Sequence, residues 1–206
     1  MIHREQPSGL SLQEYLDAER RLSPGEFFVW QSPPTVIYGR NQVLENEVNL
    51  AFCREKGIAV VQRRSGGGCV YSDPGNVMVS FVVEPGPVEE IFPRMLGHVA
   101  GFLRSLGLEA EVSGHNDILV GGRKVSGNAY YKTPGADIVH GTLMFDVDLD
   151  TLENAIRPPA EKLARHGVAS VRQRVANLKP LLEAAGNPMD ISRFKFLLAA
   201  WLESVC

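Results

Sequence analysis

Cysteine is scarce in this chain, and the few that are present follow no recognisable pattern. Cys53, Cys69 and Cys206 are an odd number at irregular spacing. Such a set supplies neither a disulfide framework nor the paired spacing of a structural metal site. A reducing compartment is the simplest setting for free thiols, so we expect a cytoplasmic protein.

Long apolar runs and an excess of positive charge are also missing. No stretch approaches the ~20 apolar residues that cross a membrane, and segment 1–7 lacks the apolar core of a signal peptide. The 21 Lys and Arg residues against 24 Asp and Glu give a formal net charge of −3. A general nucleic-acid binder would usually be basic. We therefore expect neither nucleic acid nor a membrane as a partner.

What remains is the composition of an ordinary globular protein, without repeats or low-complexity segments. Hydrophobic residues make up 44% of the chain and charged residues 22%. A length of 206 residues lies within the range of a single domain. We therefore expect one domain over residues 1–206.

Short apolar strands dominate the middle of the chain, and amphipathic helices flank them. The expected strands cover 27–30, 35–39, 58–61, 77–83, 109–112, 117–120, 124–131 and 137–146. The expected helices cover 10–22, 49–56, 88–106, 151–156, a segment beginning at 161, 178–184 and 191–205. This order predicts an α+β fold, in which helices pack on a mixed or antiparallel sheet.

The most unusual stretch joins two of these strands, where two arginines precede three glycines. Its candidate site residues are Arg63, Arg64, Ser65, Gly66, Gly67, Gly68, Cys69, Val70, Tyr71 and Asn76. Exposed backbone N–H groups with fixed cations beside them form a good anion site. A flexible hairpin loop with solvated arginines is the alternative. Neighbouring residues on a strand diverge, so we expect one arginine to face the site and the other to be structural.

A second candidate stretch begins with Asn116 and Asp117, just before a short strand. The returning strand carries Lys124. Because alternate residues of a strand share a face, we expect Lys124, Ser126 and Asn128 to point the same way. If that face lines a pocket, it offers an ammonium, a hydroxyl and an amide.

These stretches together resemble the lipoate–protein ligases, within the larger group of biotin and lipoate protein ligases and octanoyltransferases. The motifs are Arg63-Arg64-x-Gly66-Gly67-Gly68-x-Val70-Tyr71-x-Asp73-x-Gly75-Asn76, Asn116-Asp117, Lys124-x-Ser126-Gly127-x-Ala129, His140-Gly141-Thr142-Leu143 and Ser170-Val171-Arg172-x-Arg174-Val175-x-Asn177-Leu178. The opening of the family's catalytic domain, from Trp30 to Asn49, and the pair Glu161-Lys162 also match, so nearly the whole chain is covered. Ser72 departs from the pattern, which commonly has a histidine there. Many of these ligases carry a further small C-terminal domain, which we expect to be absent.

The resemblance implies an ATP-dependent reaction at this site. Lipoate would be activated with ATP and Mg²⁺ to lipoyl-AMP, and the acyl group would pass to a lysine of a lipoyl carrier domain. Lys124 is the expected catalytic residue, because an ammonium can bridge a carboxylate oxygen and a phosphate oxygen. Asp117 is the expected Mg²⁺ ligand, since hard cations prefer oxygen.

The resemblance also implies which residues surround the lipoyl group and AMP. Besides the Gly-rich stretch, they are Arg40, Asn116, Asp117, Ser126, Gly127, Ala129, His140 and Gly141. Aromatic residues around Trp30 are expected to border the acyl pocket. A lone histidine such as His140 is more often structural than catalytic, so both roles stay open for it.

Three alternatives remain beside the ligase. An octanoyl or lipoyl transferase of the same fold would hold the acyl group on a cysteine thiolate without ATP. No cysteine follows Lys124 before Cys206, which favours the ligase. The chain could instead transfer preformed lipoyl-adenylate with the help of a separate small accessory subunit, or bind a lipoyl group without catalysis. The choice between lipoate and octanoate stays open.

Overall fold

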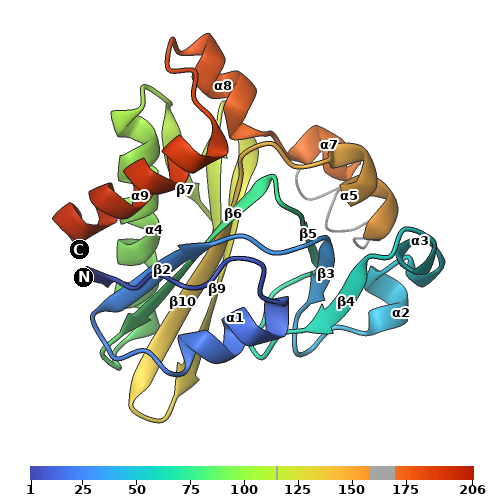
Figure 1. The fold of residues 1–206 in the computed structure, drawn as a ribbon, viewed down its shortest axis with the longest axis horizontal. Coiled ribbons are helices and arrows are strands. Elements are labelled where there is room, and N and C mark those ends of the chain that lie inside the picture. Colours follow the sequence, from blue (N-terminus) through green and yellow to red (C-terminus); the bar gives the residue numbers. More distant parts are fainter. Residues whose placement is uncertain (115, 158–169) are drawn as a thin grey trace.

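The computed structural model describes residues 1–114, 116–157 and 170–206 (Figure 1). Its centre is a seven-stranded sheet in the order β1-β2-β6-β10-β9-β8-β7. Its strands are β1 (Ile2–His3), β2 (Glu26–Trp30), β6 (Asn76–Val83), β7 (Ala110–Ser113), β8 (Asp117–Val120), β9 (Arg123–Thr133) and β10 (Ala136–Met144). Strand β1 runs parallel to β2, and the other neighbouring pairs are antiparallel.

A separate three-stranded sheet, in the order β4-β3-β5, lies beside the large one. Its strands are β3 (Thr35–Tyr38), β4 (Ala59–Gln62) and β5 (Val70–Ser72). The Gly-rich loop, defined as residues 63–69, connects β4 to β5. Because β4 and β5 both pair with β3, this loop has to cross the end of β3.

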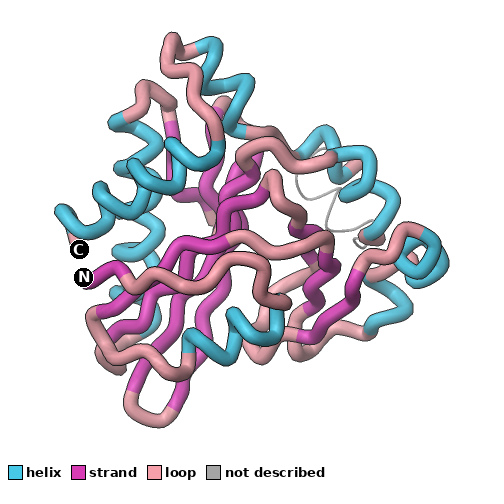
Figure 2. The backbone as a smooth tube through the Cα atoms, in the orientation of Figure 1, coloured by secondary structure: helices cyan, strands magenta, loops and turns pink. Residues whose placement is uncertain are grey.

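Helices surround the strands on the outside of the molecule (Figure 2). They are α1 (Leu12–Glu19), α2 (Leu44–Glu47), α3 (Leu50–Glu55), α4 (Val88–Ser105), α5 (Leu149–Ala155), α7 (Val171–Arg174), α8 (Leu178–Ala184) and α9 (Ile191–Val205). Phe27 packs with α4 and α9 on one face of the large sheet, whereas its neighbour Phe28 packs with α1 on the other. The main core therefore lies under α4 and α9, and the opposite face is left for α1 and the small sheet.

The predicted α+β fold with a mixed sheet is confirmed. Helices α4, α8 and α9 match their predicted ranges to within one residue. Ser11 caps α1, and Glu14 completes a capping box, but the helix ends at Glu19 rather than at residue 22. The predicted helix that begins at 161 lies outside the described residues.

The prediction for the Gly-rich stretch was incomplete, because it missed β5. Val70–Ser72 pairs with β3 before the chain enters β6, so the Gly-rich loop does not join adjacent strands of one hairpin. The short elements β1, α2 and α7 were not predicted either. In the described part of the chain, no helix has both the length and the apolar character to span a bilayer.

Gly39 lets the Gly-rich loop pass against the end of β3. A Cβ added at Gly39 would lie 2.1 Å from the carbonyl oxygen of Gly67. We expect Gly39→Ala to lower the free energy of unfolding by about 1–3 kcal/mol, because backbone would have to move. Thermal or denaturant unfolding measures this change.

Gly97→Ala is the matched control for that substitution. Gly97 lies on the exposed side of α4, with nothing within 4 Å of an added Cβ. Alanine is the better helix former, so this variant is expected to gain up to about 1 kcal/mol. Equal effects of the two substitutions would contradict the close approach at Gly39.

Candidate active site

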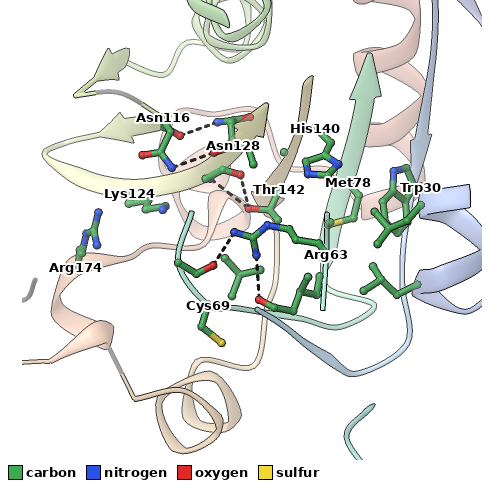
Figure 3. A pocket seen from close by; sticks show the side chains of 18 residues that line it. Trp30, Arg63, Cys69, Met78, Asn116, Lys124, Asn128, His140, Thr142 and Arg174 are labelled. Carbon is green, nitrogen blue, oxygen red and sulfur yellow. Dashed lines mark hydrogen bonds between the residues drawn. The ribbon is translucent and has the colours of Figure 1, made fainter. Parts of the chain in front are cut away.

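A cavity lies between the large sheet, the small sheet and α1 (Figure 3). One group of its lining residues is apolar: Leu12, Leu16, Trp30, Ile37, Val70 and Met78. The other group is polar or charged and includes Asn116, Lys124, Asn128 and Arg174. A lining of this kind suits a ligand with an apolar chain and an anionic head group.

Lys124 and Arg174 share one carboxylate at the polar side of the cavity. Lys124 Nζ lies 2.7 Å from Asp117 Oδ1, and Arg174 Nη2 donates to Asp117 Oδ2 at 2.6 Å. Backbone contacts hold the two segments together, because Val175 bridges Lys124 and the N–H of Ala176 donates to the Lys124 carbonyl. Two cations on one carboxylate leave a net positive charge beside the cavity.

The predicted shared face holds for Ser126 and Asn128, whose side chains are hydrogen-bonded, but it was wrong for Lys124. Strand β9 has a bulge against β8, where Ile118 pairs with Ser126 but Leu119 pairs with Lys124. The extra residue interrupts the alternation of side chains. Lys124 instead lies over Gly127, whose added Cβ would be 2.6 Å from Lys124 Nζ.

Asn116 and Asn128 hold the two ends of the β8–β9 hairpin together. Asn116 Nδ2 donates to the carbonyl of Asn128, and Asn128 Nδ2 donates to the carbonyl of Asn116 (Figure 3). The Asn128 amide lies over Gly141, where an added Cβ would be 1.9 Å from Asn128 Oδ1. Asn128 also donates to Ser126 Oγ, which is buried. Position 141 therefore has to be glycine, because the Asn128 amide occupies the space that a Cβ would fill.

The two adjacent arginines diverge, as predicted. Arg63 is buried and directs its N–H groups to Ser65 Oγ and to the carbonyls of Ile37, Gly66 and Gly68. Burial lowers the pKa of the Arg63 guanidinium below its usual value. Arg64 is exposed and lies outside the cavity lining. Arg63 therefore holds the Gly-rich loop in shape.

His140 joins this loop to α1 through a buried carboxylate. Its Nε2 lies 2.8 Å from Ser65 Oγ, and its Nδ1 lies 2.8 Å from Glu19 Oε1. Glu19 also accepts from Ser80 and Tyr131. Glu19 was missed at the sequence level, although a carboxylate between Tyr15 and Leu22 on the apolar side of an amphipathic helix was an available signal.

The order Ser65–His140–Glu19 has the hydrogen-bond pattern of a hydrolase triad, but the surroundings exclude that chemistry. Ser65 is 0% exposed, and its oxygen already accepts from Arg63 Nε at 3.0 Å. A nucleophilic serine needs open space beside its oxygen for the substrate carbonyl. This network therefore positions the Gly-rich loop.

The structure gathers about half of the expected site residues around the cavity. Those that line it are Arg63, Gly68, Cys69, Val70, Asn116, Lys124, Gly127, Ala129, His140 and Gly141. Those that do not are Arg40, Arg64, Ser65, Gly66, Gly67, Tyr71, Asn76, Asp117 and Ser126. Within this second set, Ser65 and Asp117 contact lining residues, and Gly66 and Gly67 line an adjoining opening.

Some lining residues were not among the expected site residues. Thr142, Arg174, Leu12, Leu16 and Met78 belong to this set. Arg174 stands within a matched motif, but nothing in the sequence places it beside Lys124. Ser72, at the place of the family's usual histidine, is buried, and its hydroxyl accepts from Ser32 Oγ. It does not line the cavity.

Comparison of the sequence with known proteins finds similarity to lipoate–protein ligases. The lipoate–protein ligase LplJ of Bacillus subtilis (strain 168) is 40% identical over 177 residues, which cover 84% of this chain and 53% of that protein. A second relative, lipoate–protein ligase 1 of Staphylococcus aureus, is covered over 57% of its length. The chain thus spans about half the length of these curated relatives.

Solved structures extend the similarity to the fold. The putative lipoate protein ligase of Thermoplasma acidophilum with bound lipoic acid matches at a TM-score of 0.81 and 26% identity, over 100% of this chain and 84% of that one. The lipoylation system of the same organism is described as a bipartite ligase and its E2 lipoyl domain, with a TM-score of 0.80 and 26% identity, over 99% and 82%. A lipoate–protein ligase A bound with ATP matches at 0.81 and 25% identity, over 100% and 85%.

The match to a family model covers most of the chain. Residues 7–203 match the model described as the lipoyl protein ligase A/B catalytic domain. This range includes the Gly-rich loop, both hairpins that carry Lys124 and His140, and the segment that carries Arg174. The chain belongs to the lipoyl protein ligase A/B catalytic domain family.

Proposed function

We propose that this protein is an ATP-dependent lipoate–protein ligase. Lipoate would displace pyrophosphate from ATP to form lipoyl-AMP, and a lysine amine of a lipoyl carrier domain would then displace AMP. The observation that carries this proposal is the cavity with an apolar wall and with Lys124 and Arg174 at its polar side. It is supported by relatives described with lipoic acid, ATP and an E2 lipoyl domain.

In the proposed mechanism, Lys124 acts on both anions of the first step. A carboxylate attacks a phosphate poorly because the two repel each other, and an ammonium between them removes that barrier. In the second step the same ammonium stabilises the charge that develops on the acyl oxygen. The apolar wall shields the mixed anhydride from water. Arg174 adds a second fixed cation beside the reacting atoms.

We propose that Mg²⁺ would enter the site bound to the phosphates of ATP. In the described residues, no three His, Cys, Asp or Glu side chains gather into a site for a metal ion. Both oxygens of Asp117, the expected ligand, contact cationic side chains. These residues do not fit a metal site of their own, whereas Mg²⁺ is often held mainly by substrate phosphates.

Two further parts of the proposal concern the setting of the enzyme. We propose that residues 1–206 form one catalytic domain whose own residues carry out both steps. Activation with the help of an accessory polypeptide, as the bipartite description of the Thermoplasma ligase suggests, is the alternative. We also propose that the enzyme works in the cytoplasm. The proposal is supported by the cysteine content, because three cysteines without a disulfide pattern suit a reducing compartment.

The direct test is the intact mass of a lipoyl carrier domain after incubation with this protein, lipoate, ATP and Mg²⁺. We expect a lipoyl increment, because the site can hold both the acyl chain and the anions. An increment only with supplied lipoyl-AMP would support the transfer step and assign activation to the accessory polypeptide. No increment under either condition would overturn the proposed function.

Cys69 supports a second candidate, the ATP-independent transferase. It lines the cavity, whereas Cys53 and Cys206 do not, and burial raises the pKa of both of those thiols. If the ligase proposal holds, Cys69→Ala keeps ATP-dependent lipoylation within about threefold, since the change removes a single half-buried sulfur atom. An acyl-enzyme detected by mass with an octanoyl donor, and lost in Cys69→Ala, would instead establish the transferase.

A further inference from the structure

A positively charged groove lies beside the cavity. Four cationic side chains line it: Arg20, Arg40, Arg64 and Lys132. Its volume is about 640 Å³, and no carboxylate belongs to its lining among the described residues. All four cations are exposed. The chain as a whole carries a net charge of −3, so this groove is a local concentration of the opposite sign.

Separate parts of the sequence build this groove. Arg20 follows α1, Arg40 follows β3, Arg64 belongs to the Gly-rich loop, and Lys132 lies near the end of β9. In the described structure, none of the four has a carboxylate within 4 Å. The carboxylate of adjacent Glu19 is buried and bonded to His140. Like charges gathered without counter-charges repel each other, so an anionic partner would stabilise them.

The groove adjoins an opening that borders the cavity. It shares Gly66 and Tyr130 with a neighbouring opening, which in turn shares Asn116, Asn128 and Ala129 with the cavity. A partner that occupies the groove therefore lies beside an opening that shares part of its wall with the cavity. The acceptor lysine of the proposed reaction has to enter by such an opening.

We propose that this groove docks the acidic surface of the carrier domain beside its target lysine. The inference rests on the proposed function and names the surface chemistry of its protein partner. ATP is the less suitable occupant, because its reacting phosphate belongs at Lys124 and Arg174, neither of which lines the groove. Four cations spread over an exposed surface match the many carboxylates of a folded domain.

The test compares two double variants that carry the same change in charge. Arg20→Glu with Lys132→Glu replaces two of the four cations by carboxylates, which cancels the net positive charge of the groove and leaves the cavity lining intact. Arg54→Glu with Lys56→Glu makes the matched change on the exposed side of α3. Binding of an unmodified carrier domain is measured by calorimetry without any reaction, and its KM is measured in lipoyl transfer.

We expect the groove variant to weaken carrier binding and raise its KM by at least about fivefold, with kcat at saturating carrier unchanged. The difference in carrier affinity between the groove variant and the unchanged protein should shrink at 1 M salt, where the Debye length is about 3 Å. The α3 variant should behave as the unchanged protein. Weaker binding in a protein that transfers no lipoyl group would support the docking groove and reject the ligase.

Two results would overturn the docking proposal. One is carrier binding equal to that of the unchanged protein in the groove variant. The other is a raised KM for ATP in lipoate-dependent pyrophosphate exchange with carrier binding unaffected, which would make the groove a nucleotide site. Both measurements remain informative whether or not the transfer reaction is observed.

Discussion

Lys124→Ala is expected to lower the rate of lipoyl-AMP formation by at least about a hundredfold, equivalent to about 3 kcal/mol of lost transition-state stabilisation. The ammonium of Lys124 lines the cavity and has three donors, so it can contact a carboxylate oxygen and a phosphate oxygen at once. Lipoate-dependent exchange of pyrophosphate into ATP measures this step without a carrier domain. Transfer from supplied lipoyl-AMP measures the second step in the same variant.

Arginine at this position tests whether a positive charge alone is enough. The Lys124 ammonium fits against Asp117 at 2.7 Å and above Gly127, where space is limited. A planar guanidinium is larger and aims its donors differently, so we expect Lys124→Arg to lose most of the activity as well. Rates within about threefold of the unchanged protein in either variant would contradict the proposed role of Lys124.

Controls separate a loss of chemistry from a loss of folding. Removing Lys124 leaves Asp117 with Arg174 as its ion-pair partner, so a lower unfolding midpoint is expected. Rates are therefore compared below the unfolding transition. Lys56→Ala is the matched control, because Lys56 is exposed at the end of α3, and it should leave both rates unchanged.

Much of the fold and part of the site follow from local sequence patterns. Apolar periodicity located α4 and α9. The spacing of Arg63 and Arg64 on a strand end predicted their divergence. These inferences succeed because each depends on the geometry of one element.

The failures concern contacts between elements. The bulge in β9 follows from pairing with β8, so the alternation along this strand gave the wrong face for Lys124. Strand β5 is only three residues long and exists because β3 lies beside it. Arg174 reaches Asp117 across 57 residues of sequence. No local sequence pattern predicts these contacts. Glu19 is the exception, because a carboxylate on the apolar side of an amphipathic helix can be recognised from the sequence.

Arg63→Met is expected to destabilise the protein by about 3–5 kcal/mol, because removing a buried cation leaves several of its acceptors without donors. Those acceptors are the carbonyls of Ile37, Gly66 and Gly68, all at 2.7–3.2 Å from the guanidinium nitrogens. The bond to Ile37 is buried and those to Gly66 and Gly68 are partly buried, so water can replace the lost donors only in part. Denaturant unfolding measures the loss, and Arg64→Met is the matched control, expected to change stability by less than about 0.5 kcal/mol.

The same variant tests how the Gly-rich loop serves the site. If Arg63 acts by holding the loop, Arg63→Met raises the KM for lipoate in pyrophosphate exchange even where the protein remains folded, because the carbonyl of Gly68 is no longer held in place beside the cavity. Arg63→Lys should recover only part of the stability, since one ammonium cannot reach acceptors on both β3 and the loop. If Arg63→Met and Arg64→Met unfold at the same denaturant concentration, Arg63 does not organise the loop, and the shape of the cavity must depend on the Glu19–His140–Ser65 network instead.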